Sequence, residues 1–215
     1  KEGSKVIFTY NSNEKGAEET FKKLGPDSSK FKVDVTKDKE IESLFEFIKE
    51  KYGKLDILIN NAGADIGGDQ LDIKVWRETF EVDLFSVVNI TTKFLKIISR
   101  GGRILNVSSL AGLERFGYED IIPYSAAKSA VNSFTRTLAK VVESKVLINA
   151  IAPGYTKTPI WHVTDKKEKE YSHDQLIDRF ILPEEIADMA VAIIKNDAMT
   201  GEIVVVDGGL SLKTV

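Results

Sequence analysis

Tyr124 and Lys128, in the run Ile-Pro-Tyr-Ser-Ala-Ala-Lys, are the residues whose types and spacing most clearly suggest chemistry. Residues 130–142, which follow, contain neither Gly nor Pro, so both residues are expected on the first turns of one long helix. Residues four apart share a helical face, which places a phenol beside an ammonium. Because a nearby cation favours the phenolate, Lys128 is expected to lower the pKa of Tyr124 and make it a proton donor near neutral pH.

Three short apolar runs, each followed by small or polar residues, predict the strands that position this pair. In an open α/β sheet, ligands bind at the carboxyl ends of such strands. A Tyr-x-x-x-Lys motif alone has low specificity, because a solvated helix can carry one by chance, so these neighbouring motifs decide its interpretation. The runs and the loops after them are residues 55–59 with Asn60-Asn61-Ala62-Gly63, residues 103–107 with Ser108-Ser109, and residues 145–152 with Pro153-Gly154.

With these motifs in this order, the sequence resembles the short-chain dehydrogenase/reductase family over nearly its whole length. The resemblance implies a doubly wound, Rossmann-type α/β fold with a parallel sheet, formed by residues 1–215 as a single domain. It also implies hydride transfer between a nicotinamide cofactor and a carbonyl or secondary alcohol. The matches are Asn60-Asn-Ala-Gly63, Ser109, Tyr124 with Lys128, Pro153-Gly154 followed by Thr158, and Val206-Asp-Gly-Gly209.

The resemblance assigns roles to the catalytic candidates. Tyr124 would be the general acid or base, and Lys128 would hold the nicotinamide ribose and tune Tyr124. Ser109 would donate a hydrogen bond to the substrate oxygen, with Ser108 as the competing hydroxyl. Enoyl reductases of the superfamily space the tyrosine and lysine more widely, which favours a carbonyl reductase, similar to the 3-oxoacyl carrier-protein reductases and the sugar or polyol dehydrogenases.

Asp83 departs from the family pattern. The family places an Asn on the long helix after the Asn-Asn-Ala-Gly loop, and here that stretch reads Glu81-Val-Asp-Leu84. The family's Asn acts largely through its main-chain carbonyl, so a backbone role survives the change. The carboxylate is also able to pair with Lys128, raise the pKa of Lys128 and weaken its effect on Tyr124.

The cofactor candidates come from the same resemblance. NAD-preferring relatives carry an Asp at the end of the second strand, whereas this chain has Tyr10, Asn11 and Ser12, which favours NADP(H) over NAD(H). Asp34, followed by Val35, matches the family's adenine-contacting acid. The remaining cofactor-binding candidates are Asn60, Ala62 and Gly63 along the ribose and nicotinamide, Tyr124 and Lys128, Pro153 and Gly154, and Thr156 and Thr158 at the carboxamide.

One family feature is absent. The family opens with a strand, a turn of the form Thr-Gly-x-x-x-Gly-x-Gly and a helix that receives the pyrophosphate, but here Lys1 lies just before a run, residues 5–10, that resembles the second strand. In the family order 3-2-1-4-5-6-7, loss of the first strand leaves unpaired backbone groups that cost about 1–3 kcal/mol each. We therefore expect an N-terminally incomplete version of a longer protein, which binds cofactor poorly as it stands.

Composition agrees with an enzyme domain. With 215 residues, of which 42% are hydrophobic, the chain is able to bury one sizeable core. The net charge of −3 gives no reason to expect nucleic acid or a membrane as partner. The absence of Cys excludes thiolate metal sites and suits a reducing compartment, so we expect a cytoplasmic protein without a metal site.

The coarse pattern alternates strand and helix. The polar segment 156–182 has two interpretations: a solvated surface helix, or the family's substrate lid with Trp161 and His162. Strands are expected near residues 5–10, 30–34, 55–59, 103–107, 145–150 and 202–206, and helices near 14–24, 38–52, 73–99, 122–143 and 184–195, with Thr36 a plausible N-cap.

Two functions remain open at this level. The first is the NAD(P)-dependent oxidoreductase, acting on a small molecule as a homodimer or homotetramer. The second is a non-catalytic binding or scaffold protein, which the missing turn and Asp83 favour. For assembly, residues 204–212 are expected in a second contact, and apolar residues at helical spacing are expected in the first: Val82, Phe85, Val88, Val131, Phe134 and Leu138.

Overall fold

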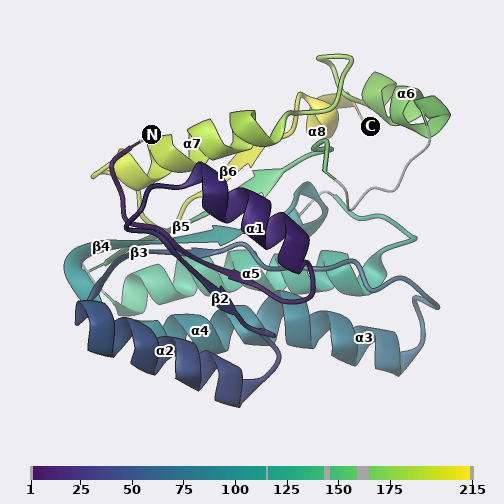
Figure 1. Cartoon of the computed structure of the whole chain (residues 1–215). Helices are drawn as coiled ribbons and strands as arrows, with labels where there is room; N and C mark the ends of the chain where they lie inside the picture. Colours follow the sequence, from purple (N-terminus) through teal and green to yellow (C-terminus); the bar gives the residue numbers. More distant parts are fainter. Residues whose placement is uncertain (1, 115, 143–145, 159–164, 214–215) are drawn as a thin grey trace. The chain divides into compact units, whose positions relative to one another are not determined.

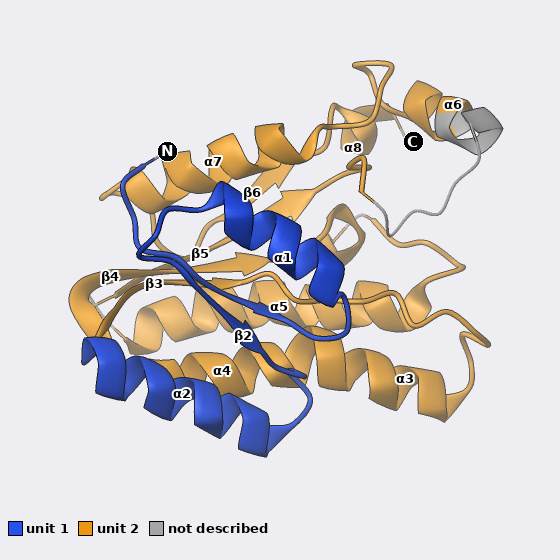
Figure 2. Ribbon diagram, viewed as in Figure 1, with its two compact units in different colours: residues 1–53 blue, residues 54–215 orange. Residues whose placement is uncertain are grey.

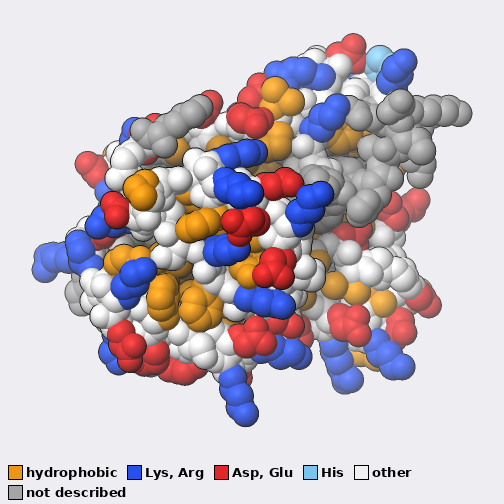
Figure 3. All heavy atoms as spheres, in the orientation of Figure 1, with side chains coloured by type: hydrophobic (Ala, Val, Ile, Leu, Met, Phe, Trp, Pro, Cys, Tyr) orange, Lys and Arg blue, Asp and Glu red, His pale blue; other side chains and the backbone are white. Residues whose placement is uncertain are grey.

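The computed structural model describes residues 2–114, 116–142, 146–158 and 165–213. Within the chain, contacts divide the residues into two compact units, Lys1–Gly53 and Lys54–Val215 (Figure 2). We describe each unit by itself. Acidic and basic side chains alternate across the face shown in Figure 3.

Unit 1 is a β-α-β-α segment. Its strands, β1 (Ile7–Tyr10) and β2 (Ser29–Lys32), pair in parallel, with Ile7 opposite Ser29 and Tyr10 opposite Lys32. The first helix, α1 (Glu14–Lys23), begins where the Asn13 side chain accepts a hydrogen bond from the backbone N–H of Gly16. The second, α2 (Asp38–Tyr52), buries one apolar stripe made of Ile41, Leu44, Phe45 and Ile48.

Unit 2 is built on a four-stranded sheet in the order β3-β4-β5-β6 (Figure 1). All its pairings are parallel, so the predicted parallel α/β architecture is confirmed. Parallel strands buried on both faces read as continuous apolar runs, as β6 and the carboxyl-terminal half of β4 do. The strands are β3 (Leu55–Asn60), β4 (Ile98–Val107), β5 (Val146–Pro153) and β6 (Ile203–Val206).

Helices cover both faces of this sheet. Ile104 and Leu105 of β4 point to opposite faces, and each is 1% exposed. Ile104 packs with Ala139 of a helix on one face, and Leu105 packs with Ile193 of a helix on the other. The helices of unit 2 are α3 (Ile73–Phe80), η1 (Glu81–Phe85), α4 (Ser86–Phe94), η2 (Leu110–Gly112), α5 (Ile122–Val141), α6 (Asp165–Asp174), α7 (Pro183–Lys195) and α8 (Leu210–Lys213).

The long helix expected at residues 73–99 differs from the structure in two ways. Its middle, η1, is a π-helical turn between α3 and α4. Such turns are rare in proteins, and those that occur often lie at functional sites. Its end is earlier than expected, because α4 stops at Phe94 and β4 begins at Ile98. The Leu55–Ile98 pairing with β3, followed by a register shift, draws these residues into the sheet.

The apolar helix residues expected at an assembly interface separate into two groups. Val131 is fully buried, whereas Leu138 packs against the core cluster around Ile104 and is only partly buried. Phe85, in contrast, is 50% exposed. Among the described residues, no helix is long and apolar enough to cross a membrane.

Candidate active site

Tyr124 and Lys128 lie on the first two turns of α5, as predicted. Pro123 occupies the first turn, where its missing N–H costs no helical hydrogen bond. The Lys128 Nζ lies 5.4 Å from the centroid of the Tyr124 ring. The Lys128 side chain is only 4% exposed, so its charge is held inside the protein.

Two other elements hold the Lys128 ammonium. It donates to the backbone carbonyl of Val107, at the carboxyl end of β4, with an N–O distance of 3.2 Å. It also lies 3.0 Å from Oδ1 of Asp83 on η1. Gly63 leaves room for this pair, because a Cβ at that position would lie 2.7 Å from Asp83 Oδ1 and 3.2 Å from Lys128 Nζ. Three segments distant in sequence thus meet at one ammonium group.

The Asp83 carboxylate is fully buried, with a side-chain exposure of 0%. The Lys128 ammonium lies within ion-pair distance of Oδ1, so opposite charges hold the two side chains together. Burial raises the pKa of Asp83, and the charge of Lys128 acts in the opposite direction. The sequence-based prediction that this carboxylate pairs with Lys128 is therefore confirmed.

The pKa of Tyr124 differs from the expectation. Burial raises the pKa of the phenol, and this effect exceeds the lowering caused by the Lys128 charge. The charge of Asp83 raises the pKa of Tyr124 further, whereas a hydrogen bond with the Ser109 hydroxyl lowers it. The predicted direction of the Lys128 effect was right, but the predicted net lowering was wrong, because the sequence did not reveal how deeply the ring is buried.

Ser109 and Ser108 occupy different environments after β4. Ser109 is half-buried and caps η2, where its Oγ accepts a hydrogen bond from the N–H of Ala111 at 3.2 Å. Ser108 is 3% exposed, and its hydroxyl donates to the backbone carbonyl of Lys128 at 3.3 Å. The Ser108 hydroxyl thus links the end of β4 to α5 by a hydrogen bond, and the Ser109 hydroxyl lies beside Tyr124.

A buried polar network joins the elements beneath these residues, and sequence reasoning missed it. The Asn60 Nδ2 donates to Thr91 Oγ1 and to Asn106 Oδ1, both at 2.8 Å, and Asn106 Nδ2 donates to Thr135 Oγ1 at 2.9 Å. The amide nitrogen of Asn60 is therefore used inside the protein, and the cofactor-binding role expected for Asn60 stays a prediction. The signal available in the sequence was Asn106, a polar residue inside the apolar run of β4.

The end of β5 carries the next group of candidates. Gly154 lies so close to Asp207 that a Cβ added to Gly154 would be 2.8 Å from the Cα of Asp207. The Thr156 hydroxyl donates to the Gly154 carbonyl at 3.1 Å, which fixes the turn that leads to Thr158. Tyr155 lies in this turn, with its ring centroid 6.2 Å from that of Tyr118, and the sequence analysis did not single out either ring. Trp161 and His162, the lid candidates, lie outside the described residues.

The adenosine candidates lie in unit 1, at the carboxyl ends of its two strands. Tyr10 ends β1, and Asn11 and Ser12 follow it in exposed positions. Lys30 of β2, which sequence reasoning missed, has its ammonium 5.9 Å from the centroid of the Tyr10 ring and pairs with Glu18.

The acidic candidate of unit 1 sits in a local turn. Asp34 follows β2, and Val35 comes after it. The Asp34 Oδ1 accepts hydrogen bonds from the hydroxyl and the backbone N–H of Thr36, which lower the pKa of Asp34. The Asp34 side chain therefore caps this turn, and the expectation that Thr36 is the N-cap of α2 is wrong, because that position belongs to Lys37.

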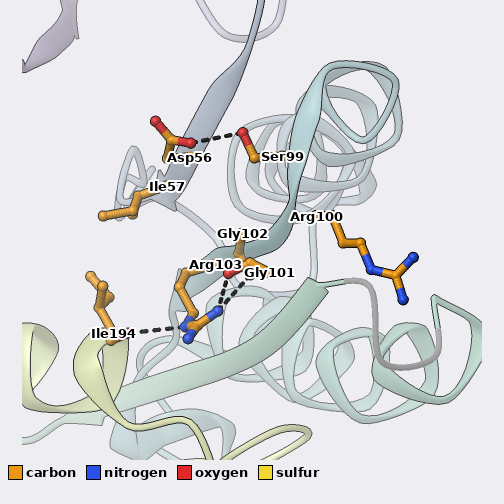
Figure 4. Close-up of a pocket in the computed structure, with 8 residues that line it drawn as sticks. All are labelled: Asp56, Ile57, Ser99, Arg100, Gly101, Gly102, Arg103 and Ile194. Atoms are coloured by element: carbon orange, nitrogen blue, oxygen red, sulfur yellow. Dashed lines mark hydrogen bonds between the residues drawn. The ribbon is translucent and has the colours of Figure 1, made fainter.

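A separate hollow of about 240 Å³ lies at the amino ends of β3 and β4 (Figure 4). Arg103, which lines it, donates to the carbonyl of Ile194 at 3.0 Å and pairs with Asp197. On its other side, Asp56 accepts a hydrogen bond from Ser99 at 2.7 Å. The Arg103 guanidinium and the Asp56 carboxylate therefore already have protein partners. The hollow lies at the ends of the strands away from Tyr124.

The residues around Lys128 fit a nicotinamide nucleotide in chemical type. The nearly buried ammonium is a donor for ribose hydroxyls, and Gly63 beside it keeps the space next to the ion pair free of a side chain. Among the described residues, no group of His, Cys, Asp and Glu has the arrangement of a metal site.

Known proteins match the chain along nearly its whole length. A family model described as enoyl-(acyl carrier protein) reductase matches residues 1–211. Diacetyl reductase [(S)-acetoin forming] of Staphylococcus epidermidis is 33% identical over 216 residues, which cover 90% of this chain and 82% of that protein. The 3-oxoacyl-[acyl-carrier-protein] reductase of Aquifex aeolicus is 34% identical over 221 residues, covering 97% and 88%.

Solved structures give the same picture. A variant of actinorhodin polyketide ketoreductase with NADPH superposes with a TM-score of 0.84 at 28% identity, over 96% of this chain and 97% of that one. A variant of a Serratia marcescens short-chain dehydrogenase/reductase gives a TM-score of 0.90 at 25% identity, over 98% and 89%.

Proposed function

Because the chain belongs to the short-chain dehydrogenase/reductase family, whose members are NAD(P)-dependent oxidoreductases, we propose that it interconverts a small ketone and the corresponding secondary alcohol, with Tyr124 as proton donor and acceptor. The observation that carries the proposal is the contact of the Tyr124 ring with the buried Lys128 ammonium, beside the Ser109 hydroxyl. The family model's description names an enoyl reductase, but the relatives named above reduce ketones, which agrees with the four-residue spacing of Tyr124 and Lys128.

Each residue has a defined task in this proposal. The Tyr124 hydroxyl gives its proton to the ketone oxygen during reduction and takes a proton from the alcohol during oxidation. The Ser109 hydroxyl donates a hydrogen bond to the same oxygen, where negative charge develops in the transition state. Lys128 binds the ribose hydroxyls of the nicotinamide nucleotide and offsets part of the cost of ionising the phenol.

The bound nicotinamide nucleotide supplies or accepts the hydride. We propose NADP(H) as the favoured form, because the residues after β1, Asn11 and Ser12, are neutral groups able to bond a phosphate. The structure of a related ketoreductase with NADPH supports this preference. Asp34 and Val35 remain the adenine candidates, and Ala62, Gly63, Pro153, Gly154, Thr156 and Thr158 the nicotinamide candidates.

The proposal is tested with Tyr124→Phe, which removes only the hydroxyl. With NADPH and either diacetyl or a 3-oxoacyl thioester, turnover is expected to fall about 10²–10⁴-fold, the usual contribution of a positioned proton donor. The dissociation constant for NADPH, measured by fluorescence titration, is expected to stay within about twofold. Tyr52→Phe, which loses a hydroxyl in unit 1, is the matched control and keeps full turnover. A Tyr124→Phe enzyme with wild-type turnover excludes the proposed role.

We also propose a homodimer or homotetramer, with the exposed Phe85 at a subunit contact. Phe85→Ser is expected to weaken association, which light scattering over a concentration series measures. A protein that is monomeric and active at micromolar concentration contradicts this part of the proposal.

A further inference from the structure

Two opposite charges are buried next to the proposed proton donor. The Asp83 side chain is 0% exposed and the Lys128 side chain 4% exposed, and their charged atoms lie 3.0 Å apart. Because water and salt ions cannot reach such a pair, its electrostatic effect on neighbouring groups is screened far less than that of a surface pair. Any group beside it therefore experiences the charge of both members.

The π-helical turn fixes Asp83 in this position. Within η1, Asp83 is buried while Phe85, two residues later, is half exposed. The space that receives the carboxylate is completed by Gly63, where even a methyl group would come within 2.7 Å of Oδ1. The carboxylate thus lies in an enclosed space between η1 and the Gly63 backbone rather than on the protein surface.

Three charged side chains act on the Tyr124 hydroxyl. Lys128 contributes one positive charge from α5, Asp83 one negative charge from η1, and Asp65 one negative charge from the loop after β3. Ser109 adds a neutral hydrogen bond. Asp65 is exposed, and so are the charged residues of α3 and the start of η1, which are Lys74, Arg77, Glu78 and Glu81. Asp83 is therefore the one buried negative charge beside Tyr124 among the described residues.

We propose that Asp83 is a positioning residue that offsets the Lys128 charge, keeps the Tyr124 hydroxyl protonated to higher pH and so extends the pH range of ketone reduction upward. This inference rests on the proposed function. Reduction requires the protonated phenol and oxidation requires the phenolate. A negative charge that offsets the ammonium stabilises the first form relative to the second. The burial and the Asp83 charge that raise the pKa of Tyr124 agree with this direction.

Asp83→Asn tests the proposal, because the amide has nearly the same shape and no charge. As the pH rises through the pKa of Tyr124, the rate of reduction falls and the rate of oxidation rises. Both limbs of kcat/KM against pH are expected to move to lower pH by about one pH unit or more, the usual effect of one close charge.

Asp65→Asn is the matched control, since it removes an exposed negative charge from the same neighbourhood. Its limbs are expected to move by less than those of Asp83→Asn. Added salt is expected to abolish the Asp65→Asn shift and to leave the Asp83→Asn shift, because only the exposed charge is screened. Equal shifts in the two variants, or a salt-sensitive shift in Asp83→Asn, contradict the proposal.

A second readout does not depend on activity. The ultraviolet absorbance of tyrosinate is followed against pH, and subtraction of the Tyr124→Phe curve isolates the titration of Tyr124. In Asp83→Asn this titration is expected at lower pH than in the wild type, and an unchanged or higher value overturns the inference. If Tyr124→Phe keeps full turnover, the proposed function fails instead, so the two failures are distinguishable.

Discussion

Thr91→Val is a direct test of whether the buried polar network stabilises the fold beneath the candidate site. Thr91 is fully buried on α4, and its Oγ1 accepts a hydrogen bond from Asn60 Nδ2 at 2.8 Å. Valine has nearly the same shape, so no cavity is created. The substitution leaves one N–H of Asn60 without its acceptor, while the bond to Asn106 at 2.8 Å remains.

The magnitude follows from that single unpaired donor. A buried polar group that loses its partner costs about 1–3 kcal/mol. Thr92→Val on the same helix is the matched control, because Thr92 is exposed and its hydroxyl donates to the Val88 carbonyl of its own helix. Exposed substitutions of this kind change the free energy of unfolding by about 0.5 kcal/mol or less.

Urea unfolding followed by circular dichroism measures both variants. The midpoint of Thr91→Val is expected below that of Thr92→Val, with an unchanged slope, because the amount of surface exposed on unfolding is the same. Free energies of unfolding that agree within about 0.5 kcal/mol would refute the reasoning. Such a result would mean that Asn60 finds another acceptor or that water reaches the network.

Three further predictions concern glycines and a surface ion pair. Gly112→Ala places a Cβ 2.6 Å from the Lys128 backbone carbon, so η2 must move from α5 and the free energy of unfolding is expected to fall by about 1–3 kcal/mol, as thermal unfolding would show. Gly63→Ala puts a methyl group against the Asp83–Lys128 pair, and turnover is expected to fall about 10–100-fold with a smaller loss of stability, as kinetics and melting curves together would reveal. Hydrogen bonding with Arg179 lowers the pKa of Glu185 from its ordinary value of 4.5 to about 2, so the stability that it contributes is present above about pH 4.5 and is lost as the pH falls towards 2. Glu185→Gln is therefore expected to flatten the acid side of a plot of melting temperature against pH, and an unchanged curve contradicts this.

Much of the fold was predictable because the elements are long and strongly patterned. Residues 38–52 carry one apolar stripe between a charged first turn and Gly53, and the observed α2 has those bounds. The helix expected at 73–99 was less predictable, because its apolar residues continue at helical spacing into β4. Only the pairing of Ile98 with Leu55, a contact between distant residues, decides that this segment joins the sheet.

In the candidate site too, residues that stand out by chemical type were predictable, and contacts between distant elements were not. Tyr124, Lys128 and Asp83 were found because their chemical types stand out, and the structure brings all three together. Thr91 and Thr135 were not found, because a threonine inside a helix looks ordinary until its partner on another element is known. The pKa of Tyr124 was misjudged for a related reason, since burial is a property of the packed chain rather than of a motif.

The π-helical turn η1 also determines where the length of this segment can vary. A π turn holds one residue more than the α turn it replaces. Deleting one residue between positions 81 and 85 would therefore let the segment continue as an α-helix with α4 in nearly the same orientation. A one-residue deletion early in α4, where no extra residue is present, would rotate every later residue by about 100° relative to α3, and Thr91 and Phe94 would leave the core together. The π turn is thus a point at which this helical segment can lose a residue without turning its buried face outward, and the loss would displace Asp83 rather than the core.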